Sequence, residues 1–257
     1  MDLGLKDKVA IITGGGSGIG RIIAHILADE GANIVIADLN EEGANKVAGE
    51  VKERGAGSLA VKTDVSKLEE TDKLVKSTLN QFGKVDILVH GAVFFNVQPF
   101  MKTSPDDWER VVKIAQFGAM NCSRSVLEHM ITANSGRIIF IGSDAGRMGD
   151  SYQPIYAGAK GGIVAFAKSL AQDVGRHGIT VNVVSPALVL TEENKDVLTK
   201  MYGLDDEKQA KRLYSAYPVR RLGTSEDVAY MVAFLVSGKA SDITGQTISV
   251  NGGFCML

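Results

Sequence analysis

Seven short apolar segments recur along the chain, and longer stretches with helical character separate them. Each segment is too short to form a helix, and most are rich in Val and Ile. The segments are Val9–Thr13, Asn33–Ala37, Ser58–Lys62, Val85–Val89, Arg137–Ile141, Thr180–Ser185 and Gln246–Val250. Such runs are typical of strands that are covered on both faces, as in a parallel sheet. Their alternation with helices predicts an α/β fold with one doubly wound, mostly parallel sheet of seven strands and helices on both faces.

Signals for helix ends fall between these strands. Gly31 follows an apolar helical stripe and predicts its end. Ser66 and Glu69 have the spacing of a capping box, which predicts a helix start at Ser66. Ser104 followed by Pro105 predicts another start, because proline needs no hydrogen-bond donor at the first helical position.

Residues 1–257 form a single predicted domain, because no linker, low-complexity tract or repeat interrupts them. The alternation of strands and helices is interrupted by residues 187–217, between Pro186 and Pro218. These residues are polar, and their segment is too long for an ordinary connection. We name them the lid segment. They follow the carboxyl end of a strand, where ligands bind in such sheets, so we expect them to cover a substrate. A pair of solvated surface helices is the alternative.

The composition excludes several classes of protein. Hydrophobic residues make up 45% of the chain, and a net charge of -2 gives no field that would attract nucleic acid or an acidic membrane. No apolar run approaches the length of a membrane span, and the N-terminus lacks the pattern of a signal peptide, so we expect a cytoplasmic protein. Cys122 and Cys255 lack metal-ligand spacing, so we expect free thiols and no metal site.

A glycine-rich turn, Thr13–Gly20, joins the first strand to the first helix. Glycines let a backbone turn sharply and approach a pyrophosphate, which the free N–H groups at the start of the helix then face. Because the cluster follows a strand and opens a helix, it indicates a Rossmann-type nucleotide site.

Asp38 follows the second strand, and a carboxylate there can accept hydrogen bonds from the adenosine ribose and repel a 2′-phosphate. Arg21 is the only cation near the turn in the sequence. The pattern therefore favours NAD over NADP, although a solvated loop aspartate is the alternative.

Tyr156 and Lys160 are spaced i, i+4 and share one face of a predicted helix. A phenol near its reference pKa of about 10 is a poor base at neutral pH, and a nearby ammonium lowers that pKa. The pair is therefore a candidate for proton transfer to a substrate oxygen. Chance is the competing explanation, because Tyr and Lys are common.

Taken together, these features resemble the short-chain dehydrogenase/reductase family, and the resemblance runs from end to end. Ser143 precedes Tyr156 by thirteen residues, the usual separation in that family. The other matching motifs are Thr13–Gly20, Asp64-Val65, Tyr156-x-x-x-Lys160, Asn182-x-x-x-Pro186, Thr191, Ile243–Gln246 and Asn251–Gly253.

The resemblance implies an NAD-dependent enzyme that interconverts a secondary alcohol and a ketone. Tyr156 is then the general acid/base, Ser143 orients the substrate oxygen, and Lys160 lowers the pKa of Tyr156 and bonds the nicotinamide ribose. The implied NAD contacts are Gly14, Ser17, Gly18, Ile19, Asp38, Asp64, Val65, Gly91, Tyr156, Lys160, Val189 and Thr191. A nucleophilic Ser143 is the rival assignment, but no nucleophile-elbow pattern surrounds it.

Two positions depart from the family pattern. His90-Gly91-Ala92-Val93 replaces the usual Asn-Asn-Ala-Gly, and we expect His90 to be structural. Ala115, followed by Gln116, stands where the family has a fourth catalytic residue, an Asn; on a regular helix Gln116 would point about 100° away. A weakly active or non-catalytic NAD-binding subunit that supports a related active partner is therefore an alternative, and a nucleotide-binding regulator is a third.

The helix from Tyr156 to Val174 carries small residues on more than one face. In the family such a helix forms a subunit interface, so we expect a homotetramer or a hetero-oligomer with a related subunit. Candidate pocket residues are Phe94, Phe95, Gln98, Asp144 and Tyr152. The phenylalanines favour a small-molecule substrate that is a cyclic or apolar secondary alcohol or a hydroxyacyl thioester, with a polyol as a further class.

Overall fold

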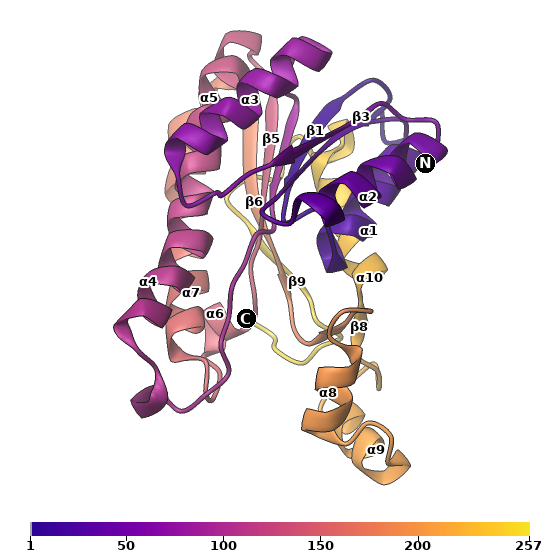
Figure 1. Ribbon diagram of the computed structural model, residues 1–257, viewed down its shortest axis with the longest axis vertical. Helices are drawn as coiled ribbons and strands as arrows, with labels where there is room; N and C mark the ends of the chain where they lie inside the picture. Colours follow the sequence, from indigo (N-terminus) through magenta and orange to yellow (C-terminus); the bar gives the residue numbers. More distant parts are fainter. Residues whose placement is uncertain (1) are drawn as a thin grey trace.

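The computed structural model describes residues 2–257. Its centre is a sheet of seven parallel strands in the order β3-β2-β1-β4-β5-β6-β9 (Figure 1). The strands are β1 (Val9–Thr13), β2 (Asn33–Asp38), β3 (Ser58–Lys62), β4 (Ile87–His90), β5 (Gly136–Ile141), β6 (Ile179–Pro186) and β9 (Thr247–Val250). All seven predicted strands are therefore confirmed, and so is the doubly wound fold. The order reverses between β1 and β4, which is where ligands bind in open sheets of this kind.

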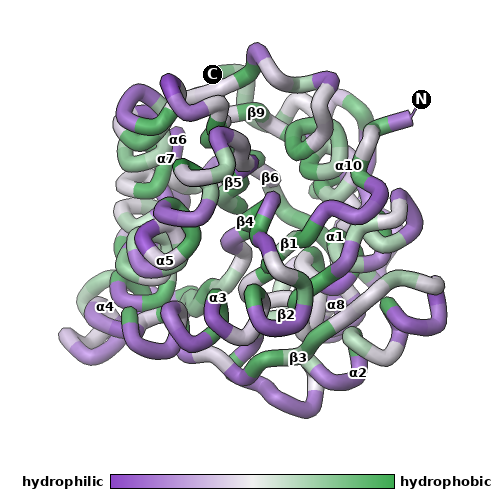
Figure 2. Tube along the Cα trace, turned by 90° about the horizontal axis from the view of Figure 1, so that it is seen from above, coloured by the Kyte–Doolittle hydropathy of each residue, from purple (hydrophilic) through white to green (hydrophobic). Residues whose placement is uncertain are grey.

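Helices cover both faces of the sheet. On one face lie α1 (Gly18–Asp29), α2 (Glu41–Glu53) and α10 (Ser225–Val236), and on the other lie α3 (Leu68–Phe82), α5 (Gly118–Ala133) and α7 (Pro154–Val174) (Figure 1). Alternate side chains of each strand enter the two separate cores, because successive side chains of a strand point to opposite faces. Seen from above, the strands form a largely hydrophobic centre (Figure 2).

The helix that begins near Pro105 is not regular. α4 (Pro105–Val112) passes through a π-helical turn, η2 (Lys113–Phe117), into α5. The predicted helix start at Ser104 is confirmed, and Ser104 forms a reciprocal capping box with Asp107. Because this segment is a π turn, the direction expected for Gln116 on a regular helix does not apply; its side-chain amide reaches the carbonyl of Ala159 on α7.

The predicted helix start at Ser66 is also wrong. α3 begins at Leu68 after Lys67, and no side chain among the described residues caps it. Ser66 instead donates to Asp64 through both its N–H and its hydroxyl, at 3.0 and 2.7 Å. Glu70, rather than Glu69, bonds back to the chain by accepting from the N–H of Asp64.

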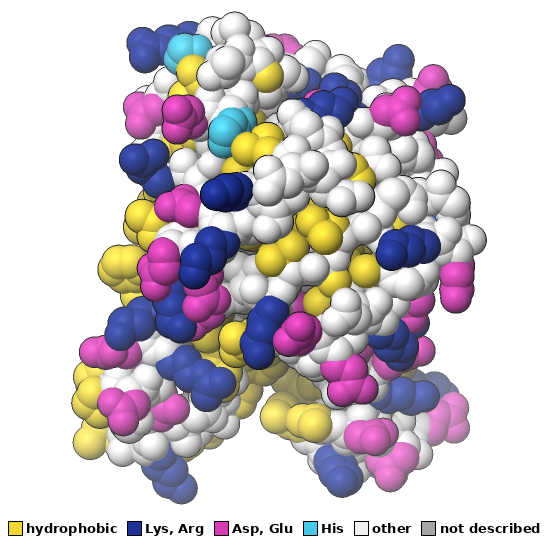
Figure 3. Space-filling view, turned by 45° about the horizontal axis from the view of Figure 1, so that its top comes forward, with side chains coloured by type: hydrophobic (Ala, Val, Ile, Leu, Met, Phe, Trp, Pro, Cys, Tyr) yellow, Lys and Arg dark blue, Asp and Glu magenta, His cyan; other side chains and the backbone are white. Residues whose placement is uncertain are grey.

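The lid segment contains a short strand and two helices, β7 (Val189–Leu190), α8 (Lys195–Tyr202) and α9 (Glu207–Ser215). β7 pairs with β8 (Gly223–Thr224) in a separate two-stranded sheet. The helices extend past the carboxyl ends of the strands (Figure 1), and the molecule is hollowed between them and the lobe that contains α4 (Figure 3).

The remaining helical elements are short. They are η1 (Phe100–Lys102), α6 (Ala145–Met148), η3 (Gly175–His177) and η4 (Gly238–Ala240). Among residues 2–257, no helix combines the length and the apolar character needed to cross a membrane.

Candidate active site

The carboxyl ends of the parallel strands bring distant segments of the chain to one edge of the sheet. The glycine-rich turn leaves β1 there, Asp38 ends β2, His90 ends β4, and Ser143 lies two residues beyond β5. α7 presents Tyr156 and Lys160 to the same edge. The topology thus explains why residues far apart in the sequence form one site.

Close packing explains several glycines of the turn. Gly14 has a φ of +67°, and a Cβ there would lie 2.9 Å from the backbone N and Cα of Ala92. A Cβ at Gly20 would overlap the carbonyl of Gly14, so α1 lies directly on the turn. These glycines bring the start of α1 against the end of β1, and Ser17 and Ile19 stand at that start.

Asp38 supports the turn from β2. Its carboxylate accepts from the N–H of Gly16 at 2.9 Å through one oxygen and from the N–H of Asn40 at 2.9 Å through the other. These bonds bring the carboxylate of Asp38 beside the turn. Its role as a ribose contact stays a prediction.

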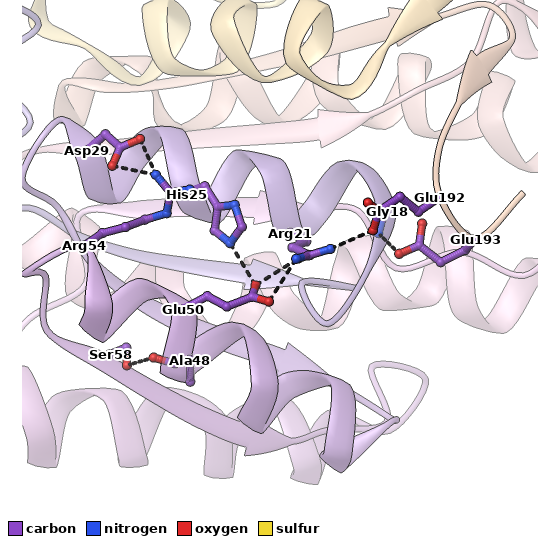
Figure 4. Close-up of polar contacts among 10 residues, drawn as sticks. All are labelled: Gly18, Arg21, His25, Asp29, Ala48, Glu50, Arg54, Ser58, Glu192 and Glu193. Carbon is purple, nitrogen blue, oxygen red and sulfur yellow. Dashed lines mark hydrogen bonds and ion pairs between the residues drawn. The ribbon is translucent and has the colours of Figure 1, made fainter. Parts of the chain in front are cut away.

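Arg21 is bonded to carboxylates other than Asp38. Its Nε and Nη2 donate to the two oxygens of Glu50 at 2.8 and 2.9 Å, and His25 contacts the same carboxylate at 2.9 Å (Figure 4). The bidentate hydrogen bond from Arg21 to Glu50 is the main reason that the pKa of Arg21 is raised. The one cation that the sequence offers near the turn is thus already paired.

Asp64 and Val65 form a fixed corner after β3. Burial raises the pKa of Asp64, but the hydrogen bonds from Ser66 and the ammonium of Lys67 together outweigh it and leave the pKa below its ordinary value. The carbonyl of Val65 accepts from the side-chain amide of Asn121 at 2.9 Å, which ties this corner to α5.

His90 connects the turn to the π-helical segment. Its Nδ1 lies 2.9 Å from the hydroxyl of Thr13, and its Nε2 lies 3.3 Å from the carbonyl of Ala115. Burial, helped by the charge of Lys160, lowers the pKa of His90 to about 3. The neutral ring therefore accepts from Thr13 and donates to Ala115. The prediction that His90 is structural agrees with this geometry. Gly91 follows, and its N–H donates to the carbonyl of Thr13 at 3.0 Å.

Tyr156 stands in the first turn of α7 beside Ser143. Burial raises the pKa of Tyr156, whereas a hydrogen bond with the Ser143 hydroxyl lowers it and the charge of Asp150 raises it further; the net shift is upward. The hydroxyl of Ser143 also accepts from the N–H of Ala145 at 3.2 Å, which fixes its position.

Lys160 lies one helical turn beyond Tyr156 and is 2% exposed. Its Nζ donates to the carbonyl of Ile141 at 2.6 Å and lies 5.7 Å from the centroid of the Tyr156 ring. Burial lowers the pKa of Lys160 to about 8, so it is mostly protonated at neutral pH. The structure thus brings Ser143, Tyr156 and Lys160 together.

Gln116 is a site residue that sequence reasoning missed. Its side-chain amide donates to the carbonyl of Ala159 at 3.3 Å, in the helical turn between Tyr156 and Lys160. A Cβ at Gly162 would overlap that amide, so Gly162 leaves room for Gln116 to reach α7. Gln116 lies within a π turn, and a pattern of residue types does not reveal such a turn.

The candidate substrate residues separate into two groups. The ring of Phe95, 52% exposed, lies 5.8 Å from the ring of Tyr156, and exposed Tyr152 is joined to Gln98 by a backbone hydrogen bond of 2.9 Å. Phe94 lies under the guanidinium of Arg110 at 3.8 Å. Asp144, in contrast, is a buried structural residue and not a pocket residue. Its carboxylate accepts from Ser185 at 3.0 Å and from Asn251.

The start of the lid segment lies beside the glycine turn. Val189 is buried, and the side chain of Asn194 donates to its carbonyl at 2.9 Å. Asn194 also bonds Thr191 reciprocally, at 2.8 and 3.3 Å. The methyl group of Thr191 is 3.9 Å from where a Cβ of Gly18 would lie.

The residues at this edge fit a dinucleotide. The N–H of Gly18, at the start of α1, donates at 3.1 Å to the carboxylate of Glu193, so an anion already occupies a position suited to a phosphate oxygen. Asp38 lies at the end of β2, where a ribose would be bonded. In the described part of the chain, no group of three or more His, Cys, Asp or Glu residues is arranged to hold a metal ion.

Comparison with known proteins identifies the family. Residues 14–255 match the family model described as enoyl-(acyl carrier protein) reductase. The chain is 35% identical over 255 residues to the 3-oxoacyl-[acyl-carrier-protein] reductase FabG of Vibrio cholerae, covering 99% of this chain and 100% of that protein. The FabG of Staphylococcus epidermidis is 36% identical over 251 residues, covering 97% of this chain and 100% of that protein.

A solved structure agrees with these relatives. NAD+-bound xylitol dehydrogenase superposes with a TM-score of 0.91 and 31% identity, covering 97% of this chain and 99% of that one. The chain therefore belongs to the short-chain dehydrogenase/reductase family, and it has the Rossmann fold of an oxidoreductase.

Proposed function

We propose that the protein is an NAD-dependent oxidoreductase that interconverts a secondary alcohol and a ketone. The observation that carries this proposal is the position of Tyr156, whose ring centroid lies 5.7 Å from the ammonium of Lys160 and whose phenol pKa, raised by burial, is lowered in part by the neighbouring Ser143 hydroxyl. The three groups lie at the edge of the sheet where the glycine-rich turn opens.

Each of the three side chains has a distinct role. In oxidation, Tyr156 as phenolate takes the proton of the substrate hydroxyl, and in reduction it returns that proton to the carbonyl oxygen. Ser143 donates to the substrate oxygen and orients it. Burial opposes the phenolate, and the hydrogen bond from Ser143 favours it. The ammonium of Lys160, 5.7 Å from the ring centroid, would favour it further. A bound nicotinamide would supply the hydride acceptor or donor.

The proposed cofactor is NAD, held by the residues named for it in the sequence. Asp38 presents a carboxylate where NADP carries a 2′-phosphate, and Arg21 is committed to Glu50. Gly14, Ser17, Gly18 and Ile19 would face the pyrophosphate. The remaining proposed contacts are Asp64, Val65, Gly91, Tyr156, Lys160, Val189 and Thr191.

The proposed substrate is a small molecule with an apolar or acyl portion. The exposed ring of Phe95 beside Tyr156, with the exposed ring of Tyr152 in the segment before α7, favours an apolar or cyclic alcohol or a hydroxyacyl thioester. The names of the relatives support the same bond change, because a 3-oxoacyl reductase and xylitol dehydrogenase both interconvert a secondary alcohol and a ketone. The lid segment would close over such a substrate.

A panel of substrates tests this proposal. Purified protein is mixed with NAD or NADP and with 3-hydroxyacyl thioesters, cyclic alcohols or polyols, and reduced cofactor is followed by absorbance. We expect turnover with NAD in at least one class. Measurable NAD binding without turnover in any class would instead favour a non-catalytic subunit. That alternative follows from Ala115, which replaces the family's fourth catalytic residue, an Asn.

The proposed assembly is a homotetramer or a hetero-oligomer with a related subunit. Gly158 and Ala165 are exposed on α7 and carry no large side chain, so a second subunit could approach the helix closely there. Gly161 and Gly162, in contrast, pack inside the subunit. Light scattering tests this proposal, and a mass equal to one chain would contradict it.

A further inference from the structure

A carboxylate near the start of the lid segment is hydrogen-bonded to the end of the glycine-rich turn. Glu193 accepts from the N–H of Gly18 at 3.1 Å, although 175 positions separate the two residues (Figure 4). Its second oxygen lies 3.7 Å from where a Cβ of Gly18 would stand. The contact is therefore made directly at the N-terminal residue of α1.

α1 offers this position because nothing local fills it. Ser17 precedes the helix but its side chain makes no capping hydrogen bond within residues 2–257, and the first turn contains no acidic residue. The N-terminus of a helix carries free N–H groups and a partial positive charge. Hydrogen bonding to Gly18 helps to keep the pKa of Glu193 below its ordinary value, although burial works against it. Glu193 is thus an anionic cap supplied from a distant segment.

Neighbouring contacts hold Glu193 in place. Glu192 accepts from the guanidinium of Arg21 at 3.0 Å, and Glu50 fixes the other edge of that guanidinium (Figure 4). On the other side, Asn194 is bonded to Thr191. Glu193 therefore stands between two anchored residues, in a segment that begins beside the proposed nicotinamide contacts.

We propose that Glu193 is an internal competitor of the dinucleotide, because its carboxylate takes the Gly18 N–H that a phosphate oxygen would accept from. This inference rests on the proposed function and concerns the regulation of the same site. Binding of a pyrophosphate displaces the carboxylate from α1 and frees the start of the lid segment. Two anions cannot share one donor at that distance without repulsion, so affinity for the dinucleotide is lower than the turn alone would give.

The test compares ligands with and without a pyrophosphate. NADH, ADP and adenosine are titrated at low ionic strength into the wild type, Glu193→Gln and Glu193→Ala, with NADH fluorescence and calorimetry as readouts. Glu207→Gln is the matched control, since it removes one carboxylate from the same lid segment and its recorded partner is Lys211 on its own helix. Melting curves check that each variant is folded.

We expect Glu193→Ala to bind NADH and ADP about two- to fivefold more tightly, the range that a single charge at a helix N-terminus provides, with a smaller gain for Glu193→Gln. Adenosine affinity and the Glu207→Gln variant should match the wild type. Unchanged or weaker binding of ADP, or an equal gain for adenosine, would overturn the proposal. A wild type that binds neither NADH nor ADP would instead remove the proposed function and this inference with it.

Discussion

His90 should make the protein sensitive to mild acid, because the folded state holds it neutral. Its pKa is about 3 in the structure, against an ordinary value of 6.5. The unfolded chain therefore binds a proton below pH 6.5 that the folded chain does not accept until about pH 3. The stability that this difference provides is complete above pH 6.5 and is lost as the pH falls towards 3.

The size of the effect follows from linkage. Between pH 7.5 and pH 5, the two pKa values imply a loss of about 2 kcal/mol in the free energy of unfolding. For a chain of this size that loss corresponds to roughly 4–8 °C in Tm. His90→Asn keeps one donor and one acceptor but has no proton to bind, so its Tm should fall less over the same interval.

Thermal melts at both pH values measure this difference. Ile139→Val is the control, because it removes a buried methylene at a cost of about 1 kcal/mol without touching an ionisable group, and Ile139 is 0% exposed. The control should keep the pH dependence of the wild type. Parallel pH dependences for the wild type and His90→Asn would refute the reasoning, whatever their absolute stabilities.

Three further predictions follow from the site. The pKa of Lys160 is about 8 in the folded protein, against an ordinary value of 10.5. The unfolding free energy of the wild type should therefore rise between pH 8 and 10.5. Urea titrations should show that Lys160→Met lacks this rise. Asp38→Ala should raise kcat/KM for NADP relative to NAD by about tenfold or more, because it removes a carboxylate from the 2′ position; an unchanged ratio would contradict the assignment. Gly162→Ala should displace Gln116 and cost about 1 kcal/mol, whereas Gly158→Ala, with open space around its Cβ, should gain roughly 0.5–1 kcal/mol in denaturant melts.

The sequence predicts most of the sheet and the location of the site. Central strands such as β1 are continuous apolar runs, and the ends of β1 and of the half-buried edge strand β3 match their predicted limits. The glycine turn, Asp38 and Ser143 lie at or just beyond the ends of strands, and parallel topology then places them at one edge. Tyr156 and Lys160 join them from the first two turns of α7. Local sequence patterns therefore suffice to predict the position of a residue that depends only on the strand or helix to which it belongs.

The parts that could not be predicted depend on contacts between distant segments. Arg21 is indistinguishable in sequence from a free cation, and only the packing of α1 on α2 pairs it with Glu50. The π turn depends on how α4 and α5 meet α7, and it reverses the expected direction of Gln116. The contact of Glu193 with Gly18 likewise exists only because the lid segment folds back onto the turn.

The most direct test of the account is a comparison of Tyr156→Phe with the wild type in both cofactor binding and turnover. If Tyr156 transfers the proton, removing its hydroxyl should leave the Kd for NADH within about twofold and lower kcat by about 10²–10⁴-fold. A variant that retains the kcat of the wild type on the same substrate would contradict the central claim.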